Sequence, residues 1–422
     1  MSTLKVNKIR DTAGSADSIT LDPNGGAVLA GITTVSTLKA TTGIVTTLTA
    51  TTGIVTTFVT NTANVGGGVT ISESGIEASG IGITCANING GQISGRRNII
   101  INGAMMMAQR GTSSTTNGIK TVDRFRADWT GTDEAPTHAQ VDLSSSATPY
   151  TLGFRKSFKI TNGNQTSGAG AGDYVGIDTQ LEAQDIAISG WNYTSTSSFV
   201  TLSFWVKSSV AQNFYGYLYT FDGTSQIYPF ETGSLTADTW TKITKTIPGN
   251  SNLTFNNDNG AGLLIQLWGF IGTTYTDSGV NLNQWAAFAS GTRTPDNTST
   301  WYTTNDATLE MTGVQLEVGS QATSFEHRSF AEELALCQRY FWNDPTPDAG
   351  YGYYATRYGN SGSFASVECP VTMRTTPTAT GTRGDGGSYS SVTTSQLRIQ
   401  FYVSNDTTTY VTSATISADA EL

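Results

Sequence analysis

A ten-residue repeat is the feature that most constrains how this chain can fold. Residues 40–49 (ATTGIVTTLT) and residues 50–59 (ATTGIVTTFV) are almost identical. Each unit has room for one strand and one turn, and three or four apolar residues cannot be buried inside so small a unit. The repeat therefore predicts a segment that completes its core against neighbouring units or against other copies of the chain.

The repeat belongs to a longer stretch, residues 27–95, which is rich in Thr and Gly and poor in large apolar side chains. A segment of this size with so few such residues cannot form a globular core. We predict an intertwined homotrimeric shaft, in which Ile, Val and Leu line a common axis and threonines face water. The alternative is an unstructured Thr/Gly-rich linker.

The composition of the whole chain favours β-structure. Of its 422 residues 13% are charged, about half the share usual in soluble proteins, and 8 Trp, 17 Tyr and 17 Phe provide material for a core. These values exclude an all-helical protein and indicate an all-β fold. The net charge of −10 and the lack of a basic run exclude nucleic acid as a partner. Three widely spaced cysteines predict neither a disulfide framework nor a zinc site.

Residues 96–325 have the pattern of an antiparallel β-sandwich or jelly roll. In residues 200–207 (VTLSFWVK) apolar and polar side chains alternate, which is typical of a half-buried strand. Gly/Ser/Asn/Asp-rich loops separate many such segments, and no helical period occurs between them. The predicted strands are 122–129, 154–161, 174–181, 200–207, 214–221, 240–247, 263–271 and 309–318.

One short helix and a small C-terminal β domain complete the predicted fold. Residues 326–345 form a helical connector, because Ser329 and Glu332 make a capping box ahead of Phe330, Leu334, Cys337 and Phe341, which are spaced as one helix face. In residues 346–422, strands are predicted at 351–358, 364–371, 397–403 and near 410–416, with an exposed loop at Gly381, Gly384, Gly386 and Gly387. This last domain would form the tip of a fibre.

Several stretches resemble bacteriophage tail-fibre proteins. NIIINGAMMMAQRG (98–111) with VDRF (122–125) is similar to the opening of a domain found in many such fibres, and TGVQLEVGSQATSFEHR (312–328) with EELALCQRYF (332–341) is similar to its close. LSFWVKSS (202–209) and WTKITKTI (240–247) resemble jelly-roll carbohydrate-binding modules. The resemblance implies a homotrimeric virion tail fibre whose N-terminus docks on the tail and whose C-terminus faces the host.

The resemblance also implies partners and a location. Residues 1–26 would be the tail-attachment segment, with Leu4, Val6 and Ile9 contacting adaptor- or nozzle-type tail proteins. The protein would be made in the host cytoplasm, assembled into the virion and bound to a host surface glycan or lipopolysaccharide. Neither a signal peptide nor an apolar run of membrane-spanning length occurs in the sequence, so no membrane insertion is expected.

Catalytic machinery is not predicted. His138 and His327 are the two histidines, so a histidine-based triad or a three-histidine metal site is not expected. Nucleotide-binding and EF-hand motifs are missing from the sequence. We therefore predict a non-enzymatic protein with no catalytic residue, metal ligand or cofactor. Two alternatives remain open: a tailspike-type glycan depolymerase, for which scattered carboxylates would suffice, and a cellular carbohydrate-binding adhesin.

Carbohydrate binding is the activity that the aromatic residues favour. Sugars stack their C–H faces on aromatic rings and pair their hydroxyls with neighbouring polar groups, and the chain's negative charge favours these contacts over electrostatic steering. Each aromatic stripe could instead belong to a core or to a subunit interface. The candidate carbohydrate-binding residues are Trp205, Lys207, Tyr215, Tyr217, Tyr219, Tyr351, Tyr353 and Arg357.

Overall fold

The computed structural model divides the chain into two units, Met1–Ile83 and Thr84–Leu422. Residues 96–343 are described without interruption. The other described stretches are 8–10, 17–21, 27–29, 62–65, 69–72, 75–78, 353–355, 363–383, 388–391, 393–401, 409–411 and 414–422. The domain boundaries expected from the sequence stay predictions.

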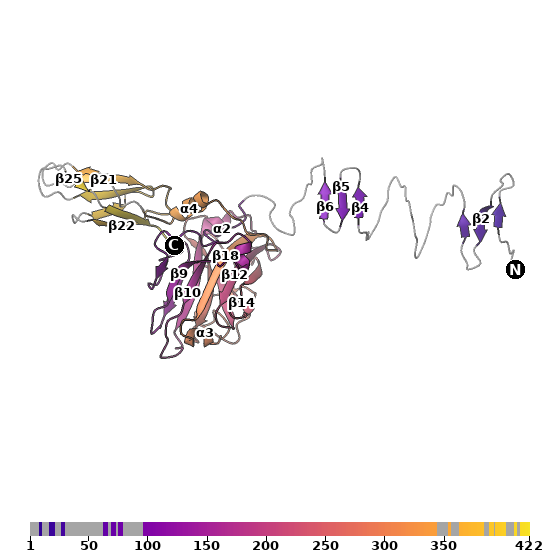
Figure 1. Cartoon of the computed structure of the whole chain (residues 1–422), viewed down its shortest axis with the longest axis horizontal. Helices are drawn as coiled ribbons and strands as arrows, with labels where there is room; N and C mark the ends of the chain where they lie inside the picture. Colours follow the sequence, from indigo (N-terminus) through magenta and orange to yellow (C-terminus); the bar gives the residue numbers. More distant parts are fainter. Residues whose placement is uncertain are drawn as a thin grey trace. The chain divides into compact units, whose positions relative to one another are not determined.

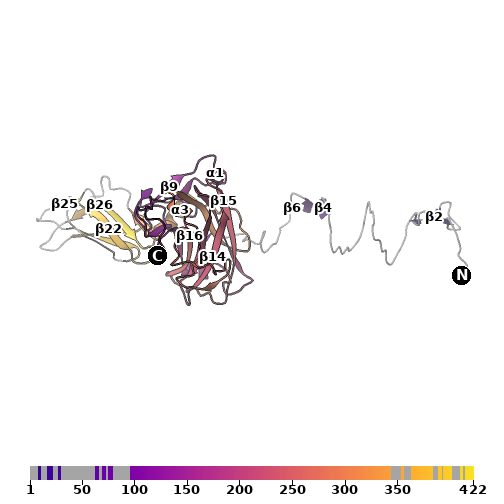
Figure 2. The ribbon, with the colours of Figure 1, turned by 90° about the horizontal axis from the view of Figure 1, so that it is seen from below.

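The centre of the second unit is a sandwich of two six-stranded antiparallel sheets (Figures 1 and 2). The first sheet has the order β15 (Thr241–Pro248), β12 (Phe199–Ser208), β18 (Thr308–Val318), β10 (Lys156–Thr161), β9 (Thr137–Asp142) and β7 (Ser113–Ser114). The second sheet has the order β17 (Ala286–Ala287), β14 (Gln226–Ser234), β13 (Asn213–Thr220), β16 (Ala261–Ile271), β11 (Tyr174–Glu182) and β8 (Arg126–Thr130).

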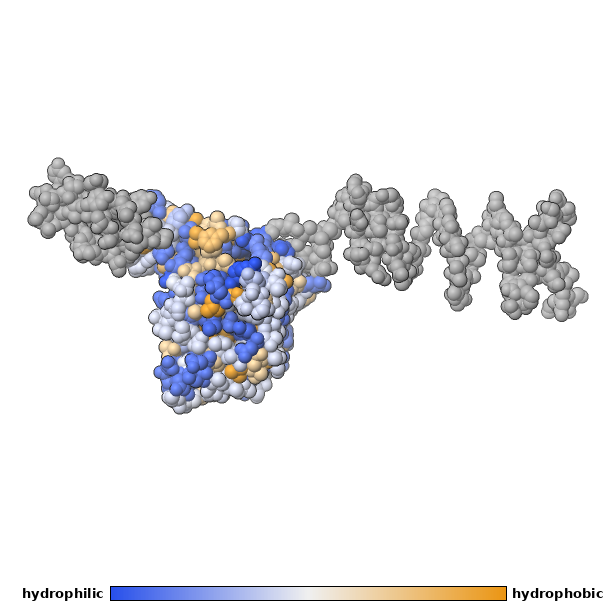
Figure 3. Space-filling view, in the orientation of Figure 1, coloured by the Kyte–Doolittle hydropathy of each residue, from blue (hydrophilic) through white to orange (hydrophobic). Residues whose placement is uncertain are grey.

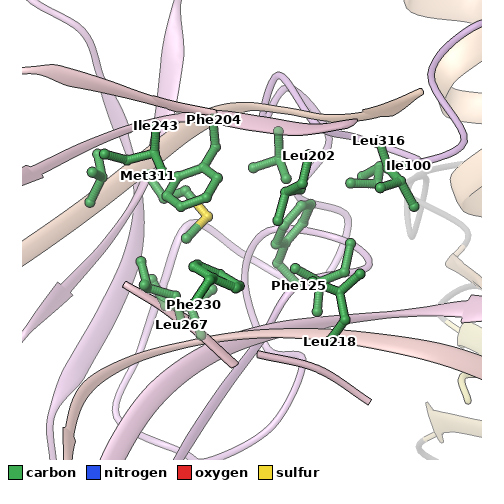
Figure 4. Packing of buried hydrophobic residues seen from close by; sticks show 14 of the residues in the cluster. Ile100, Phe125, Leu202, Phe204, Leu218, Phe230, Ile243, Leu267, Met311 and Leu316 are labelled. Carbon is green, nitrogen blue, oxygen red and sulfur yellow. The ribbon is translucent and has the colours of Figure 1, made fainter. Parts of the chain in front are cut away.

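The core lies between the two sheets and follows from alternation along each strand. In β12, Val200, Leu202, Phe204 and Val206 are all buried, as the sequence predicted. Figure 4 shows Leu202 and Phe204 of the first sheet facing Leu218 and Phe230 of the second. The all-β sandwich expected from the sequence is therefore confirmed. The outer side of β12 is more covered than predicted, because Thr201 and Ser203 are also buried.

All eight predicted strands of the sandwich are present, but two long ones were not predicted. β8 begins at Arg126, after a turn in which Arg124 has a φ of 69°. β9 has few large apolar residues, and β14 contains Pro229, which usually counts against a strand. Proline has no backbone N–H to donate. It is tolerated in β14 because β17 pairs with β14 only at Gln226 and Ile227, so no strand on that side needs a hydrogen bond from residue 229.

The helices are short: α1 (Thr148–Thr151), α2 (Ala183–Ala187), α3 (Thr300–Thr303) and α4 (Phe330–Gln338). The predicted cap is present, since Ser329 Oγ accepts a hydrogen bond from the Glu332 N–H at 3.3 Å. Two details were wrong. The helix ends before Phe341, which starts strand β19 (Phe341–Asn343), and Phe330 is 64% exposed rather than part of a buried face with Cys337.

Beyond α4 the residues that the structure describes form three small antiparallel sheets. Strand β19 pairs with β26 (Ala414–Asp419), which pairs with β22 (Thr378–Arg383). The other pairings join β21 (Ser363–Glu368), β24 (Gln396–Phe401) and β23 (Ser388–Ser391), and β20 (Tyr353–Ala355) with β25 (Thr409–Val411). Gly381 lies in β22 and not in the predicted loop, because it pairs with Ile416.

In the first unit, the described residues form two three-stranded antiparallel sheets. They are formed by β1 (Lys8–Arg10), β2 (Asp17–Leu21) and β3 (Ala27–Leu29), and by β4 (Thr62–Val65), β5 (Val69–Ser72) and β6 (Gly75–Ala78). Ile9 pairs with Ile19 in the first of these sheets. The repeat at 40–59 and the predicted attachment residues Leu4 and Val6 lie outside the described residues. The trimer and the intertwined shaft therefore stay predictions.

Candidate functional site

The outer face of the first sheet carries a groove of about 520 Å³. It crosses strands β9, β10, β18 and β12 and ends at the loop before β15. Its volume falls in the range usual for ligand sites. The lining residues are Val141, Asp142, Leu143, Ser144, Ser146, Ala147, Thr148, Lys159, Lys207, Asp238, Thr239, Trp240 and Glu310.

A row of charged side chains crosses the floor of this groove. Lys207 pairs in register with Glu310, and Glu310 pairs with Lys159 on the next strand, so the three side chains project from the same face. Glu310 is 8% exposed, and its two oxygens accept from Lys207 Nζ at 2.9 Å and from Ser157 Oγ at 3.0 Å. Lys159 makes no ion pair with any residue of the described chain. The floor thus holds one neutralised lysine and one free lysine.

An indole ring and a carboxylate stand at the β15 end of the groove. Trp240 is half-buried, and Lys207 Nζ lies 5.3 Å from the centre of its ring. Asp238 reaches the groove through a turn with a φ of 57°, fixed by its backbone N–H donating to Ser208 O at 2.7 Å. Within the described residues, neither the Trp240 indole N–H nor the Asp238 carboxylate has a hydrogen-bond partner. These groups can serve a ligand.

The structure places the predicted site residues Trp205 and Lys207 in different surroundings. Lys207 lies in the groove, whereas Trp205 does not line it. Trp205 is half-buried beside the β-bulge at Gly313, where a β-carbon on the glycine would meet Phe154 and the indole. The bulge interrupts the register of β12 with β18 between Ser203 and Trp205. Trp205 therefore serves packing around the bulge.

The predicted tyrosine stripe lies on the outer face of the second sheet. Tyr217 is 5% exposed and packs with Ile227, Leu264 and Trp268, and burial raises its pKa. Tyr219 is half-buried, with its ring 4.8 Å from that of Phe288. Tyr215 is also half-buried. Tyr217 and Tyr219 thus belong to a packed cluster and not to an open platform.

The remaining candidates lie at the C-terminal end of the chain. Tyr353 is on β20, paired with Val411. Tyr351 and Arg357 lie outside the described residues.

Sequence reasoning missed Trp240 as a site residue, although it placed a strand at 240–247. The available signal was local: the segment Ala237–Trp240 (ADTW) joins turn residues to a tryptophan just before a strand. A ring in that position lies at the rim of a sheet, where one side stays open.

Both histidines have structural partners. His138 is buried between Trp129 and Phe158, with Nδ1 2.9 Å from Thr121 Oγ1, and burial lowers its pKa. His327 Nε2 lies 3.0 Å from Leu152 O. Across the described stretches, no three His, Cys, Asp and Glu side chains gather as metal ligands, and no helix is long and apolar enough to cross a membrane.

In the view of Figure 3 the described surface is mostly pale or blue, and the apolar areas are few and separate. This agrees with a surface made largely of hydroxyl, amide and scattered charged groups. A binding site on such a surface acts mainly through polar contacts, with an exposed aromatic ring as its apolar element.

Comparisons with known proteins give matches to solved structures alone, at low TM-scores. No known protein family and no curated protein matches the chain. Among solved structures, the N-terminal cellulose-binding domain of Cellulomonas fimi β-1,4-glucanase C matches 51% of this chain and 99% of its own length, at 10% identity and a TM-score of 0.24. A family 11 carbohydrate-binding module from Clostridium thermocellum, in complex with a β-1,3-1,4-mixed-linked tetrasaccharide, matches 51% and 98% at 10% identity, with a TM-score of 0.21. At TM-scores this low, these matches carry no conclusion about the fold or the ligand of this chain.

Proposed function

We propose that this protein binds glycans and that the groove on the first sheet is the binding site. One observation carries the proposal: a half-buried indole, an unpaired carboxylate and an unpaired amine surround a single groove of ligand size. A sugar ring can stack on Trp240, while its hydroxyls donate to Asp238 and accept from Lys159. The Lys207–Glu310 pair holds the floor between these two ends.

The groove does not have the equipment of a hydrolase. Glycoside hydrolysis needs one carboxylic acid to give a proton and a second carboxylate to act as base or nucleophile. Among the three carboxylates that line the groove, only Asp238 is unpaired in the described part of the chain. Both oxygens of Glu310 already accept hydrogen bonds from Lys207 and Ser157, and Asp142 is 81% exposed and paired with Lys156. A binding role without catalysis suits this arrangement best.

The test is the affinity of the full chain for immobilised bacterial lipopolysaccharides and capsular polysaccharides. Trp240→Ala removes the stacking surface, and we expect affinity to fall at least about tenfold, the scale of one lost aromatic contact. Tyr215→Ala on the second sheet is the matched control and should leave affinity unchanged. Equal binding by wild type and Trp240→Ala would contradict the proposal.

In its wider role, the protein is proposed to be a non-enzymatic virion tail fibre that mediates host adsorption. The motifs at 98–111 and 312–341 support this through their resemblance to tail-fibre proteins. Leu4, Val6 and Ile9 would dock on adaptor- or nozzle-type tail proteins, and the repeat at 40–59 would join three copies into a shaft. The groove would then meet lipopolysaccharide or another surface glycan of the host.

The oligomeric state tests the shaft separately from the groove. Native mass measurement of the full chain should give three times the 44.6 kDa of one copy. A chain lacking residues 27–95 should lose the trimer, because the repeat needs partner chains to bury its apolar residues. A full-length monomer would remove the shaft and most of the fibre interpretation.

A further inference from the structure

We infer that the groove selects an acidic glycan and orients it: a sugar unit with a carboxylate or phosphate group lies on Lys159, and a neutral unit lies at Trp240 and Asp238. This inference rests on the proposed function, since it assigns the ligand class of the same groove. Its basis is the uneven distribution of compensated and uncompensated charges along the groove floor.

Lys159 is the cation that the groove leaves unsatisfied. Lys207 is neutralised by Glu310 at 2.9 Å, and Lys156, at the neighbouring end of β10, by Asp142 at 2.7 Å. Lys159 lies directly across from Glu310 in register, yet no carboxylate of the described residues is within 4.0 Å of its amine. Because Ser157 donates to the second oxygen of Glu310, this carboxylate is already occupied. A half-buried free amine beside a groove favours an anionic ligand group.

The other end of the groove has the opposite preference. The Asp238 carboxylate is exposed and unpaired, and it accepts hydrogen bonds but repels anions. Trp240, two residues later, presents a ring to a neutral C–H surface. A ligand that carried its charge at this end would be disfavoured, while a hydroxyl-bearing neutral sugar would be accepted.

The separation of the two ends requires more than one sugar unit. Trp240 directly precedes β15, and Lys159 lies on β10, three strands away in the order β15, β12, β18, β10. Neighbouring strands are about 4.8 Å apart, so the two ends are separated by roughly 14 Å. An oligosaccharide therefore lies across the strands, with its acidic unit toward β10 and its neutral unit toward β15.

The charge of the whole chain makes this selection a contact effect. A net charge of −10 does not draw an anionic glycan from a distance, and charges farther apart than about 8 Å are screened at physiological salt. Lys159 is a local exception on a negative molecule. Its effect should appear in how long the complex lasts and not in how fast it forms.

The experiment uses the full chain and immobilised acidic bacterial polysaccharides, each beside its carboxyl-reduced and its dephosphorylated form. Wild type should bind the untreated form about tenfold more tightly than the form that has lost its anionic group, as expected for one charge-assisted contact. Lys159→Gln should remove this preference and keep binding to the neutral form, and Lys159→Arg should restore most of it. Lys242→Gln is the matched control, an exposed lysine on β15 that does not line the groove.

The outcomes distinguish a failure of the acidic-glycan inference from a failure of the proposed glycan binding. If Lys159→Gln keeps the full preference for the acidic form, the inference is wrong and glycan binding stands. The same conclusion follows if wild type binds all three forms equally while Trp240→Ala binds each of them at least about tenfold more weakly. If Trp240→Ala binds every form as wild type does, the proposed function fails first. The dephosphorylated and carboxyl-reduced arms show which anionic group Lys159 binds.

Discussion

Away from the contact of Trp205 with Phe154 at Gly313, the outer faces of the two sheets are covered in chemically opposite ways. On the first sheet, Gln315 and Glu317 are buried polar residues whose side chains bond to the chain that follows: Thr323 N–H donates to Glu317 at 2.8 Å and Glu326 N–H to Gln315 at 2.8 Å. On the second sheet, the cover is apolar, with Trp268 and Tyr217 buried beneath side chains of the 272–299 segment such as Tyr275 and Phe288.

The difference shows where a binding site can form on a sandwich. On the first sheet, the covering segment is held by hydrogen bonds to Gln315 and Glu317. The row Lys207, Glu310 and Lys159 lies elsewhere on this face and lines an open groove. Apolar cover continues wherever further apolar side chains pack on it, as Tyr275 and Phe288 do on the second sheet. The aromatic side chains on the second sheet are therefore covered by other apolar side chains. The charged row on the first sheet, beside Trp240, lines a groove.

The largest expected effect tests this distinction with two tryptophans. Trp268 is 3% exposed, and its ring centre lies 5.2 Å from that of Tyr174 and 6.1 Å from that of Tyr217. Trp268→Ala should lower the free energy of unfolding by about 3–5 kcal/mol, the cost of a large buried cavity. Trp240→Ala, on the half-open rim of the groove, should cost less than about 1 kcal/mol. Urea denaturation of both variants measures this.

A control keeps the result specific to packing. The Trp268 indole N–H is buried and has no hydrogen-bond partner among the described residues, so its loss removes no bond. Trp268→Phe keeps most of the apolar volume and should therefore retain most of the stability. If Trp268→Ala and Trp240→Ala lowered the free energy of unfolding equally, the outer faces of the two sheets would not differ in how closely they are covered.

Much of the sandwich could be predicted from the sequence because alternation reports burial along a strand. VTLSFWVK gave the correct inner face of β12, and the capping box gave the correct start of α4. These features depend on residues close together in the chain. Alternation does not predict which distant segment of the chain packs on the outer face of a strand.

The candidate site shows that limit. Tyr217 and Trp205 were chosen because they point away from the core, but the segments that cover them come from residues far along the chain, such as Phe288 and the Gly313 bulge. Lys207 was chosen as the neighbour of Trp205 on that face, and it lies in the groove. Trp240 and Lys159 were missed because only strand order brings them to one groove.

A smaller effect sharpens the comparison through Asp178, a carboxylate that is buried on strand β11 of the second sheet. Asp178 is 2% exposed, and burial raises its pKa to about 7, although the Arg126 Nε–Oδ2 contact at 2.8 Å acts in the opposite direction. In the unfolded chain its pKa is about 3.9. Between about pH 4 and pH 7 the folded state thus holds a proton that the unfolded state has lost, and its contribution to stability falls as pH rises.

Asp178→Asn should remove this pH dependence. Between pH 5 and pH 8, wild type should lose about 2 kcal/mol more of its free energy of unfolding than the variant does, measured by urea denaturation at each pH. Asp142→Asn is the matched control, because that carboxylate is 81% exposed at the edge of the first sheet. An Asp178 that stayed ionised with Arg126 would have the opposite sign, since its stabilisation would be lost only as pH fell below about 4. A wild type that matched Asp178→Asn between pH 5 and pH 8 and lost extra stability only in acid would therefore show that the second sheet holds Asp178 as a buried charge.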